Sequence, residues 1–155
     1  MHEKIGNVAI TSRLIAAILT FVRYDVKTVE RFINAMKHHK LILPEFMNEQ
    51  GVLFGGYLLK WIDEFAYITA SLDLPGNCFV TVSLDNVVFR KPIRVGYILC
   101  FDVVRSKMGT TSAHYEIRVH NAKDPSMKDE LLFETTIVFV NVNAQGKKEP
   151  IRVAG

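Results

Sequence analysis

The chain has 155 residues, of which 49% are hydrophobic and 23% are charged, and its formal net charge is +3. These values are typical of a globular domain with a substantial core, and they exclude a disordered chain. The lysines and arginines are scattered and the net charge is small, so no nucleic-acid partner is expected.

The chain up to residue 37 has a helical pattern, and we interpret residues 1–37 as an N-terminal helical extension without an assigned role. Residues 14–22 form an apolar run of nine residues, well short of the ~20 that a membrane-spanning helix requires. No small-residue cleavage site follows this run. A packed or partner-facing helix is therefore favoured, and membrane contact through it is not expected.

The two cysteines, Cys78 and Cys100, both lie in segments with a β-like pattern. Their positions match neither a zinc knuckle nor a Cys-x-x-Cys redox pair, so they predict no metal site. Two buried thiols in a reducing compartment are the favoured interpretation, and we expect a cytoplasmic protein.

The most informative segment begins at Asn48 and ends at Asp63. Its adjacent glycines, Gly55 and Gly56, open an apolar helix. Free N–H groups at a helix start favour a negative or polarised oxygen, and glycines let a ligand approach the main chain closely. Asp63, two turns further on, could serve a bound carbonyl as general base or nucleophile.

One helix cannot bring its first glycine and this carboxylate to the same carbonyl. Gly55 precedes Asp63 by eight residues, about 12 Å along a helix that rises 1.5 Å per residue. If both act on one substrate, they must come from two protomers that face each other across a dimer interface. Ordinary alternatives stay open for each polar group. Asp63 could be a solvated carboxylate that pairs with Lys60. Asn48 could form an Asx-turn before Gly51 rather than polarise a carbonyl or orient a water.

The remainder of the chain has the pattern of long strands. We expect strands at residues 38–47, 78–90, 93–107, 110–120 and 131–142, followed by a polar tail at 143–155 that frays. Pro44 interrupts the first of these strands, and Gly96 bends the third. The strictest alternation of polar and apolar residues lies in 110–120. No helix of ordinary length separates the late strands, which favours an α+β fold with an antiparallel sheet and the single long helix buried against it.

Four colinear motifs resemble the hotdog-fold acyl-CoA thioesterases, in the branch of small acyl-CoA hydrolases. They are Asn-x-x-Gly-x-x-Phe-Gly-Gly-x6-Asp at 48–63, Val-Thr-Val-Ser-Leu-Asp leading to Phe-Arg-Lys-Pro at 80–92, Val-Gly at 95–96 and Gly-Thr-Thr-Ser at 109–112. They cover about residues 38–142, which we interpret as the thioesterase domain. The resemblance implies a hotdog fold, with a long central helix wrapped by a curved antiparallel sheet, and a homodimer or a trimer of dimers.

The resemblance also implies hydrolysis of acyl-CoA to free fatty acid and CoA, without a metal or other cofactor. Asp63 would be the catalytic carboxylate, and Gly55 and Gly56 would present the oxyanion N–H groups. Asn48 of the facing protomer would assist. Whether Asp63 activates water or forms an anhydride stays open, as does the preferred acyl chain length.

Positions that match CoA-binding residues of the family follow the second motif and surround the fourth. They are Arg90, Lys91, Arg105, Lys107, Thr111 and Ser112. Cations at such positions can pair with the CoA phosphates, although each taken singly could be an ordinary solvated charge. The branch commonly has an arginine where this chain has Thr110, so Arg105 or Lys107 would have to substitute at the nucleotide end.

Two other functions are compatible with a hotdog domain. A non-catalytic acyl-CoA sensor is disfavoured because Asp63 and Asn48 are both present, and the extension lacks the basic recognition helix of a DNA reader. A hydratase would need a histidine as acid or base, and all five histidines lie outside the predicted helix. The sequence therefore favours the thioester hydrolase.

Overall fold

The computed structural model describes residues 31–124 and 130–153. The chain divides into two units, residues 1–34 and residues 35–155. Only residues 31–34 of the first unit are described, as the end of a helix, so the predicted extension and its apolar run lie almost entirely outside the described residues. A strand already begins at Met36, which overlaps the predicted end of the extension.

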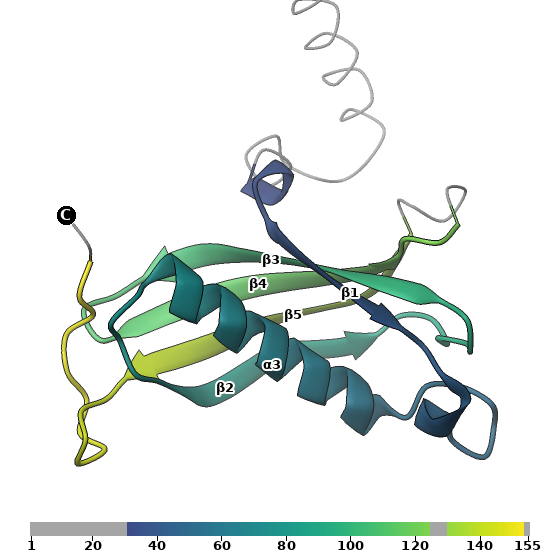
Figure 1. Cartoon of the computed structure of the whole chain (residues 1–155), viewed down its shortest axis with the longest axis horizontal. Helices are drawn as coiled ribbons and strands as arrows, with labels where there is room; N and C mark the ends of the chain where they lie inside the picture. Colours follow the sequence, from purple (N-terminus) through teal and green to yellow (C-terminus); the bar gives the residue numbers. More distant parts are fainter. Residues whose placement is uncertain (1–30, 125–129, 154–155) are drawn as a thin grey trace, which may run out of the picture. The chain divides into compact units, whose positions relative to one another are not determined.

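The second unit consists of one sheet and one long helix (Figure 1). In chain order the elements are β1 (Met36–Leu41), the 3-10 turn η1 (Pro44–Phe46), α3 (Gly55–Asp73), β2 (Phe79–Phe89), β3 (Ile98–Met108), β4 (Ser112–Asn121) and β5 (Leu131–Asn141). The strands pair antiparallel in the order β1-β3-β4-β5-β2, so β1 and β2 form the two edges. The predicted α+β architecture is confirmed.

Helix α3 lies across one face of this sheet and shares its core. Along β4, every second residue from Ala113 to Asn121 is buried, as the strict alternation predicts. The helix buries Leu58, Trp61, Ile62, Ala66, Thr69 and Ala70. Burial of each large apolar side chain stabilises the folded state by about 1.5–3 kcal/mol relative to leaving it exposed. Trp61 thus belongs to the core.

A buried tyrosine fixes the C-terminal end of α3 to the sheet. The hydroxyl of Tyr115 on β4 donates a hydrogen bond to Asp73 Oδ2 at 2.8 Å, and Arg105 of β3 pairs with the same oxygen at 3.1 Å. Burial, and then the bond to Asp73, raise the pKa of Tyr115 far above its ordinary value. The helix is therefore held at its end as well as along its buried face.

Three strand predictions need correction. Residues 93–97 do not extend β3, because Gly96 adopts φ +82 and turns the chain. The first strand ends at Leu41, since Pro44 opens η1. Two register shifts in β2, between Thr81 and Ser83 and between Asp85 and Val88, break the predicted alternation of that strand.

The polar tail is hydrogen-bonded through residue 152 rather than frayed. Val142 forms a bridge with Lys148, and the Ile151 N–H donates to the carbonyl of Thr110 at 2.8 Å. Arg152 is held by Asn77, whose side chain accepts from its N–H at 2.8 Å and donates to its carbonyl at 2.9 Å. Backbone pairing, which composition does not reveal, orders this segment.

Both cysteines are free thiols, but only Cys100 is buried; Cys78 is exposed, contrary to the prediction of two buried thiols. Within residues 31–124 and 130–153, no helix combines the length and the apolar character needed to cross a membrane.

His38 of β1 packs against α3 and carries a half-buried titratable ring. The ring stacks on Phe65 with centroids 4.8 Å apart, and its Nε2 lies 2.9 Å from Thr69 Oγ1. Because the Thr69 hydroxyl donates to the Phe65 carbonyl at 2.9 Å, His38 Nε2 is the donor in this pair. Burial, with a smaller effect of neighbouring His39, lowers the pKa of His38 from 6.5.

This lowered pKa predicts a loss of stability in mild acid. As the pH falls below 6.5, the unfolded chain takes up the histidine proton before the folded chain does, so the free energy of unfolding decreases. The contribution of His38 to the free energy of unfolding is fully present above the pKa of this histidine in the unfolded chain. It is lost as the pH falls towards the lower pKa of the folded chain. We expect urea unfolding between about pH 7 and pH 5 to show a smaller pH slope for His38→Gln than for the wild type. His114→Gln, on the opposite face of the sheet, is the control, and equal slopes for His38→Gln and the wild type would contradict the assignment.

Candidate functional site

Helix α3 begins without a capping side chain. Phe54 occupies the N-cap in an extended conformation, with φ −64° and ψ 124°, and makes no side-chain hydrogen bond to the helix. The first N–H groups, at Gly55 and Gly56, therefore have no side-chain cap, and a helix start of this kind favours an oxygen ligand with negative charge.

Aromatic rings fill the space beside both glycines. A Cβ on Gly56 would lie 2.8 Å from the ring of Phe54, and one on Gly55 would lie 3.1 Å from the ring of Phe89. Neither glycine has a positive φ. Glycine is therefore required at these two positions by the close packing of the rings and not by the backbone conformation. The expectation of open main chain at these positions is thus only partly met, because Phe89 of β2 lies over the helix start.

Asn48 forms the Asx-turn that the sequence left as one alternative. Its Oδ1 accepts hydrogen bonds from the N–H groups of Gln50 at 2.9 Å and Val52 at 3.2 Å, and Gly51 has φ +68. These bonds fix the orientation of the amide. The Nδ2 group has no hydrogen-bond partner in the described part of the chain, so it is the half of the amide that can donate to a ligand.

Asp63 is half-buried on α3 and points to β2. Thr81 Oγ1 donates a hydrogen bond to Asp63 Oδ1 at 2.6 Å. Asp63 forms no ion pair with the described residues, so the alternative of a pair with Lys60 is not realised. The bond with Thr81 leaves Oδ2 as the carboxylate oxygen for chemistry.

Thr81 is a candidate site residue that the sequence analysis did not single out. It follows Asp63 by eighteen residues on another element. Thr81 lies in the second motif, at 80–92, but nothing in that motif links it to Asp63, and only the packing of α3 beside β2 brings the two side chains together.

The glycine pair and the carboxylate lie at different points along β2. Gly55 packs against Phe89 at the end of the strand, whereas Asp63 bonds with Thr81 near its start. The structure therefore agrees with the helical arithmetic, because the two ends of the segment face different places within one chain.

An apolar cavity of about 250 Å³ opens beside the helix start. It is lined by Val52, Leu53, Leu58, Phe89, Arg90, Lys91, Pro92 and Ile93. Apolar walls with two cations among the lining residues suit a ligand that combines an apolar chain with an anionic group.

The six predicted CoA-binding residues form separate groups. Arg90 and Lys91 follow the end of β2, whereas Lys107, Thr111 and Ser112 surround the β3–β4 turn. Ser112 of β4 pairs with Val140 of β5, and Val140 pairs in turn with Val80 of β2. The turn therefore lies beside the start of β2, whereas Arg90 and Lys91 follow its end. One chain therefore does not gather the two groups around a single phosphate.

Most of these cations already have carboxylate partners. Arg90 pairs with Glu134 and Lys91 with Glu130. Arg105 is engaged at the end of α3, as described above, so it acts there as an anchor. Lys107 is exposed and forms no ion pair with residues that the structure describes. Among the four predicted cations, Lys107 is thus the one that no carboxylate of the described residues holds in place.

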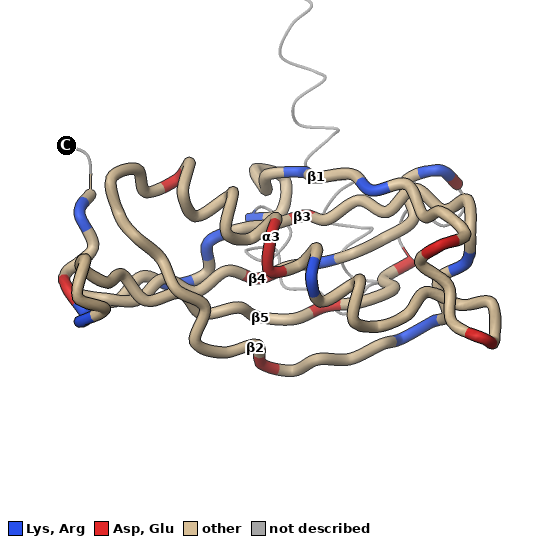
Figure 2. Tube along the Cα trace, turned by 60° about the horizontal axis from the view of Figure 1, so that its bottom comes forward, with Lys and Arg blue, Asp and Glu red and all other residues tan. Residues whose placement is uncertain are grey.

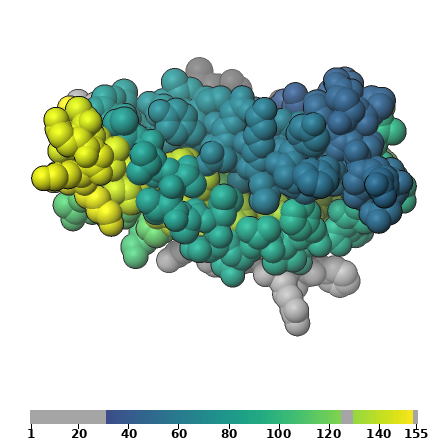
Figure 3. Space-filling view, turned by 90° about the horizontal axis from the view of Figure 1, so that it is seen from below, coloured from purple at the N-terminus to yellow at the C-terminus, as the bar shows by residue number. Residues whose placement is uncertain are grey.

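Strand β2 is an apolar edge strand (Figure 3 views the unit from this side). Five of its large apolar side chains are 40–54% exposed, namely Val80, Val82, Val87, Val88 and Phe89. Asp85 is its single charged residue, as the nearly uniform tan of β2 in Figure 2 shows. An unpaired edge of this length and composition favours pairing with another strand.

Comparison with known proteins places this architecture in a family. The profile of the thioesterase superfamily matches residues 50–128, half of the chain. The acyl-CoA thioester hydrolase YciA of Salmonella typhimurium is 30% identical over 118 residues, which cover 74% of this chain and 88% of that protein.

Solved structures agree. A hexameric thioesterase from Yersinia pestis superposes with a TM-score of 0.70 at 28% identity, covering 77% of this chain and 98% of that one. An acyl-CoA hydrolase from Staphylococcus aureus, solved with butyryl coenzyme A and coenzyme A, has a TM-score of 0.69 at 30% identity, covering 79% and 73%. The same hydrolase has been solved with alanine in place of an asparagine, an aspartate or a threonine.

A five-stranded antiparallel sheet packed on one long helix, the motif from Asn48 to Asp63 and these matches all agree. The chain belongs to the thioesterase superfamily and has the hotdog fold.

Proposed function

We propose that the protein is an acyl-CoA thioester hydrolase in which Asp63 of one protomer and Asn48 of another act on the same carbonyl. The observation that carries this proposal is the hydrogen bond between Thr81 and Asp63. It holds a half-buried carboxylate against the exposed apolar edge of the sheet, where a second chain can pair.

The substrate class is supported by chemistry and by relatives. The cavity beside the helix start offers apolar walls for an acyl group and cations that suit a phosphorylated carrier. The Salmonella relative is named an acyl-CoA thioester hydrolase, and the Staphylococcus aureus hydrolase was solved with butyryl coenzyme A. An acyl-CoA thioester fits all three observations.

Pairing of two β2 strands would complete the site. Strands related by a two-fold axis perpendicular to the sheet pair antiparallel, and residues equally distant from the axis face each other. An axis near Asp85, the middle of β2, would set Thr81 opposite Phe89 of the partner subunit. Since Thr81 holds Asp63 and Phe89 packs on Gly55, the carboxylate would then lie near the partner's helix start.

The variants of the Staphylococcus aureus hydrolase support the choice of residues. Its replaced asparagine and aspartate are fifteen residues apart, as are Asn48 and Asp63. Its replaced threonine follows the aspartate by seventeen residues, and Thr81 follows Asp63 by eighteen. The same three residue types therefore occur in the same order.

In the proposed mechanism each group has its own role. The Thr81 hydroxyl occupies Oδ1 of Asp63 and directs Oδ2 to the substrate. The N–H groups of Gly55 and Gly56 and the Asn48 Nδ2 group, all donors, stabilise the negative charge that develops on the thioester oxygen.

Two routes fit this arrangement. In one, Asp63 takes a proton from a water molecule that attacks the carbonyl carbon. In the other, Asp63 attacks that carbon and water later cleaves the anhydride. In both, the carbon–sulfur bond breaks and CoA leaves as the thiolate, which takes up a proton.

Substitution of Asp63 tests the catalytic assignment. Asn in its place keeps the shape and one acceptor but removes the basic carboxylate, so we expect kcat to fall by about 10²–10⁴-fold. The measurement is thiol release from acyl-CoA substrates of increasing chain length. Glu64→Gln, an exposed acid next to it on α3, is the matched control and should leave the rate unchanged.

Unchanged hydrolysis in Asp63→Asn would contradict the role of Asp63. A wild-type chain that binds CoA tightly but releases no thiol would favour the acyl-CoA-binding module instead.

A charge placed on the β2 edge tests the interface. Val82 is 54% exposed on β2, and Leu41 is 49% exposed on the other edge, β1. We expect Val82→Lys to dissociate the oligomer and abolish hydrolysis, because each protomer would keep only half a site. Leu41→Lys should keep the dimer. Light scattering after size exclusion gives the mass, and an active Val82→Lys monomer would refute the shared site.

A further inference from the structure

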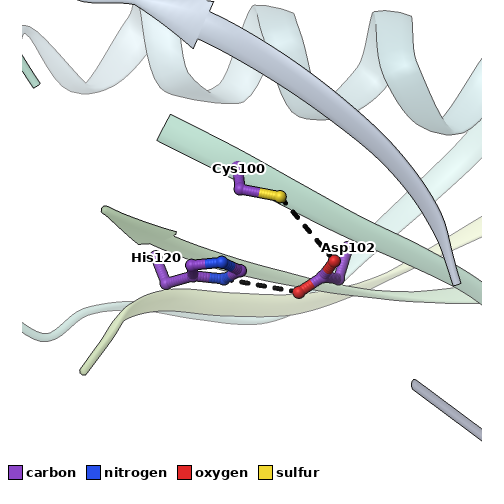
Figure 4. A group of neighbouring side chains, drawn as sticks. All are labelled: Cys100, Asp102 and His120. Atoms are coloured by element: carbon purple, nitrogen blue, oxygen red, sulfur yellow. Dashed lines mark hydrogen bonds and ion pairs between the residues drawn. The ribbon is translucent and has the colours of Figure 1, made fainter. Parts of the chain in front are cut away.

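A cysteine, an aspartate and a histidine meet on the face of the sheet opposite to α3 (Figure 4). Cys100 and Asp102 are two residues apart on β3, while Phe101 between them packs into the core. Because side chains alternate along a strand, Cys100 and Asp102 share the outer face. His120 of β4 is the direct cross-strand partner of Cys100. Register, rather than any sequence motif, brings the three together.

The three side chains have the spacing of metal ligands. Cys100 Sγ lies 3.8 Å from Asp102 Oδ1, and His120 Nδ1 lies 3.3 Å from Asp102 Oδ2. All three ligand atoms lie within 4.8 Å of one another. Around a tetrahedral zinc ion with bonds of about 2.0–2.3 Å, neighbouring ligand atoms are roughly 3.3–3.8 Å apart. Small side-chain rotations therefore suffice to place one ion among them.

The order of contacts argues against a cysteine nucleophile. A nucleophilic thiol gives its proton to an adjacent imidazole, but here the carboxylate of Asp102 contacts both the thiol and the imidazole. Cys100 is buried, and its thiol faces Asp102 rather than the imidazole. A metal ion displaces a thiol proton, and sulfur, nitrogen and carboxylate oxygen are the donors that zinc takes.

Neighbouring strand β1 supplies two further groups. Lys37 pairs with Asp102, and its side chain is 51% exposed, so it can turn to solvent when another cation binds. His39 is the cross-strand partner of Cys100 on its other side and is exposed. Directly paired residues of a sheet share a face, so His39 lies beside the cluster.

We propose that Cys100, Asp102 and His120 bind one zinc ion, with His39 as the fourth ligand. On binding, the thiol proton of Cys100 passes to solvent and the ammonium of Lys37 leaves Asp102. The ion ties edge strand β1 to β3 and β4. The site is structural and independent of the thioesterase chemistry, because the catalytic Asp63 belongs to the helix that covers the opposite face.

Metal titration of the full chain tests the site. We expect one zinc ion per chain with micromolar or tighter affinity, measured against a chromophoric chelator. Cobalt should give a thiolate charge-transfer band and the visible bands of a tetrahedral site. Cys100→Ser should remove the thiolate band, whereas Cys78→Ser, at the exposed cysteine, should leave it intact. No stoichiometric binding, or a band lost only in Cys78→Ser, overturns the proposal.

A variant that binds zinc more tightly cannot be explained by misfolding, so it complements the variants that lose binding. Lys37→Gln removes the competing ammonium and should tighten zinc binding several-fold. His120→Gln should weaken binding at least ten-fold, and His114→Gln, on the same face of β4 but outside the cluster, should leave it unchanged. Unaltered affinity in Lys37→Gln would contradict the place of Asp102 among the ligands.

Discussion

The rigidity of α3 is the constraint on which the rest of the site depends. Six buried residues fix the helix along the sheet, and the bond from Tyr115 to Asp73 fixes its end. The helix cannot bend to bring its first N–H groups to its own Asp63. In the proposed mechanism each chain therefore carries two half-sites, one at Phe89 and one at Thr81, and the chemistry requires a second chain.

Strand β2 is the edge through which two chains would pair, and the rigid helix α3 lies beside it. An exposed apolar edge is a liability in a monomer, because its free N–H and C=O groups and its valines invite association. Here the two proposed half-sites lie along the same edge. Pairing two such edges would remove the liability and complete the proposed active site in one step, and it would account for the exposed valines of β2.

The sequence predicted those features that arise from local periodicity. Helix α3 and the alternation of β4 follow from repeats of 3.6 and two residues, and the turn at Asn48 follows from Gly51. Bulges in β2 were missed because they interrupt the period, and Gly96 was predicted to bend a strand that in fact begins only at Ile98. The contact of Thr81 with Asp63 could not be predicted, since packing alone joins the two residues. The cluster around Cys100 likewise depends on strand register, which no spacing along the chain reveals.

Mixing two inactive variants tests the shared site most directly. Asp63→Asn removes the carboxylate, and Asn48→Asp keeps the Asx-turn acceptor while it replaces the Nδ2 donor. After subunit exchange, a mixed dimer would hold one site with both defects and one intact site. Equal amounts of the two variants should therefore recover about a quarter of wild-type thioester hydrolysis, since half of the dimers are mixed and half of their sites are intact. Activity that stays at the level of the separate variants after complete exchange would mean that each site lies within one chain.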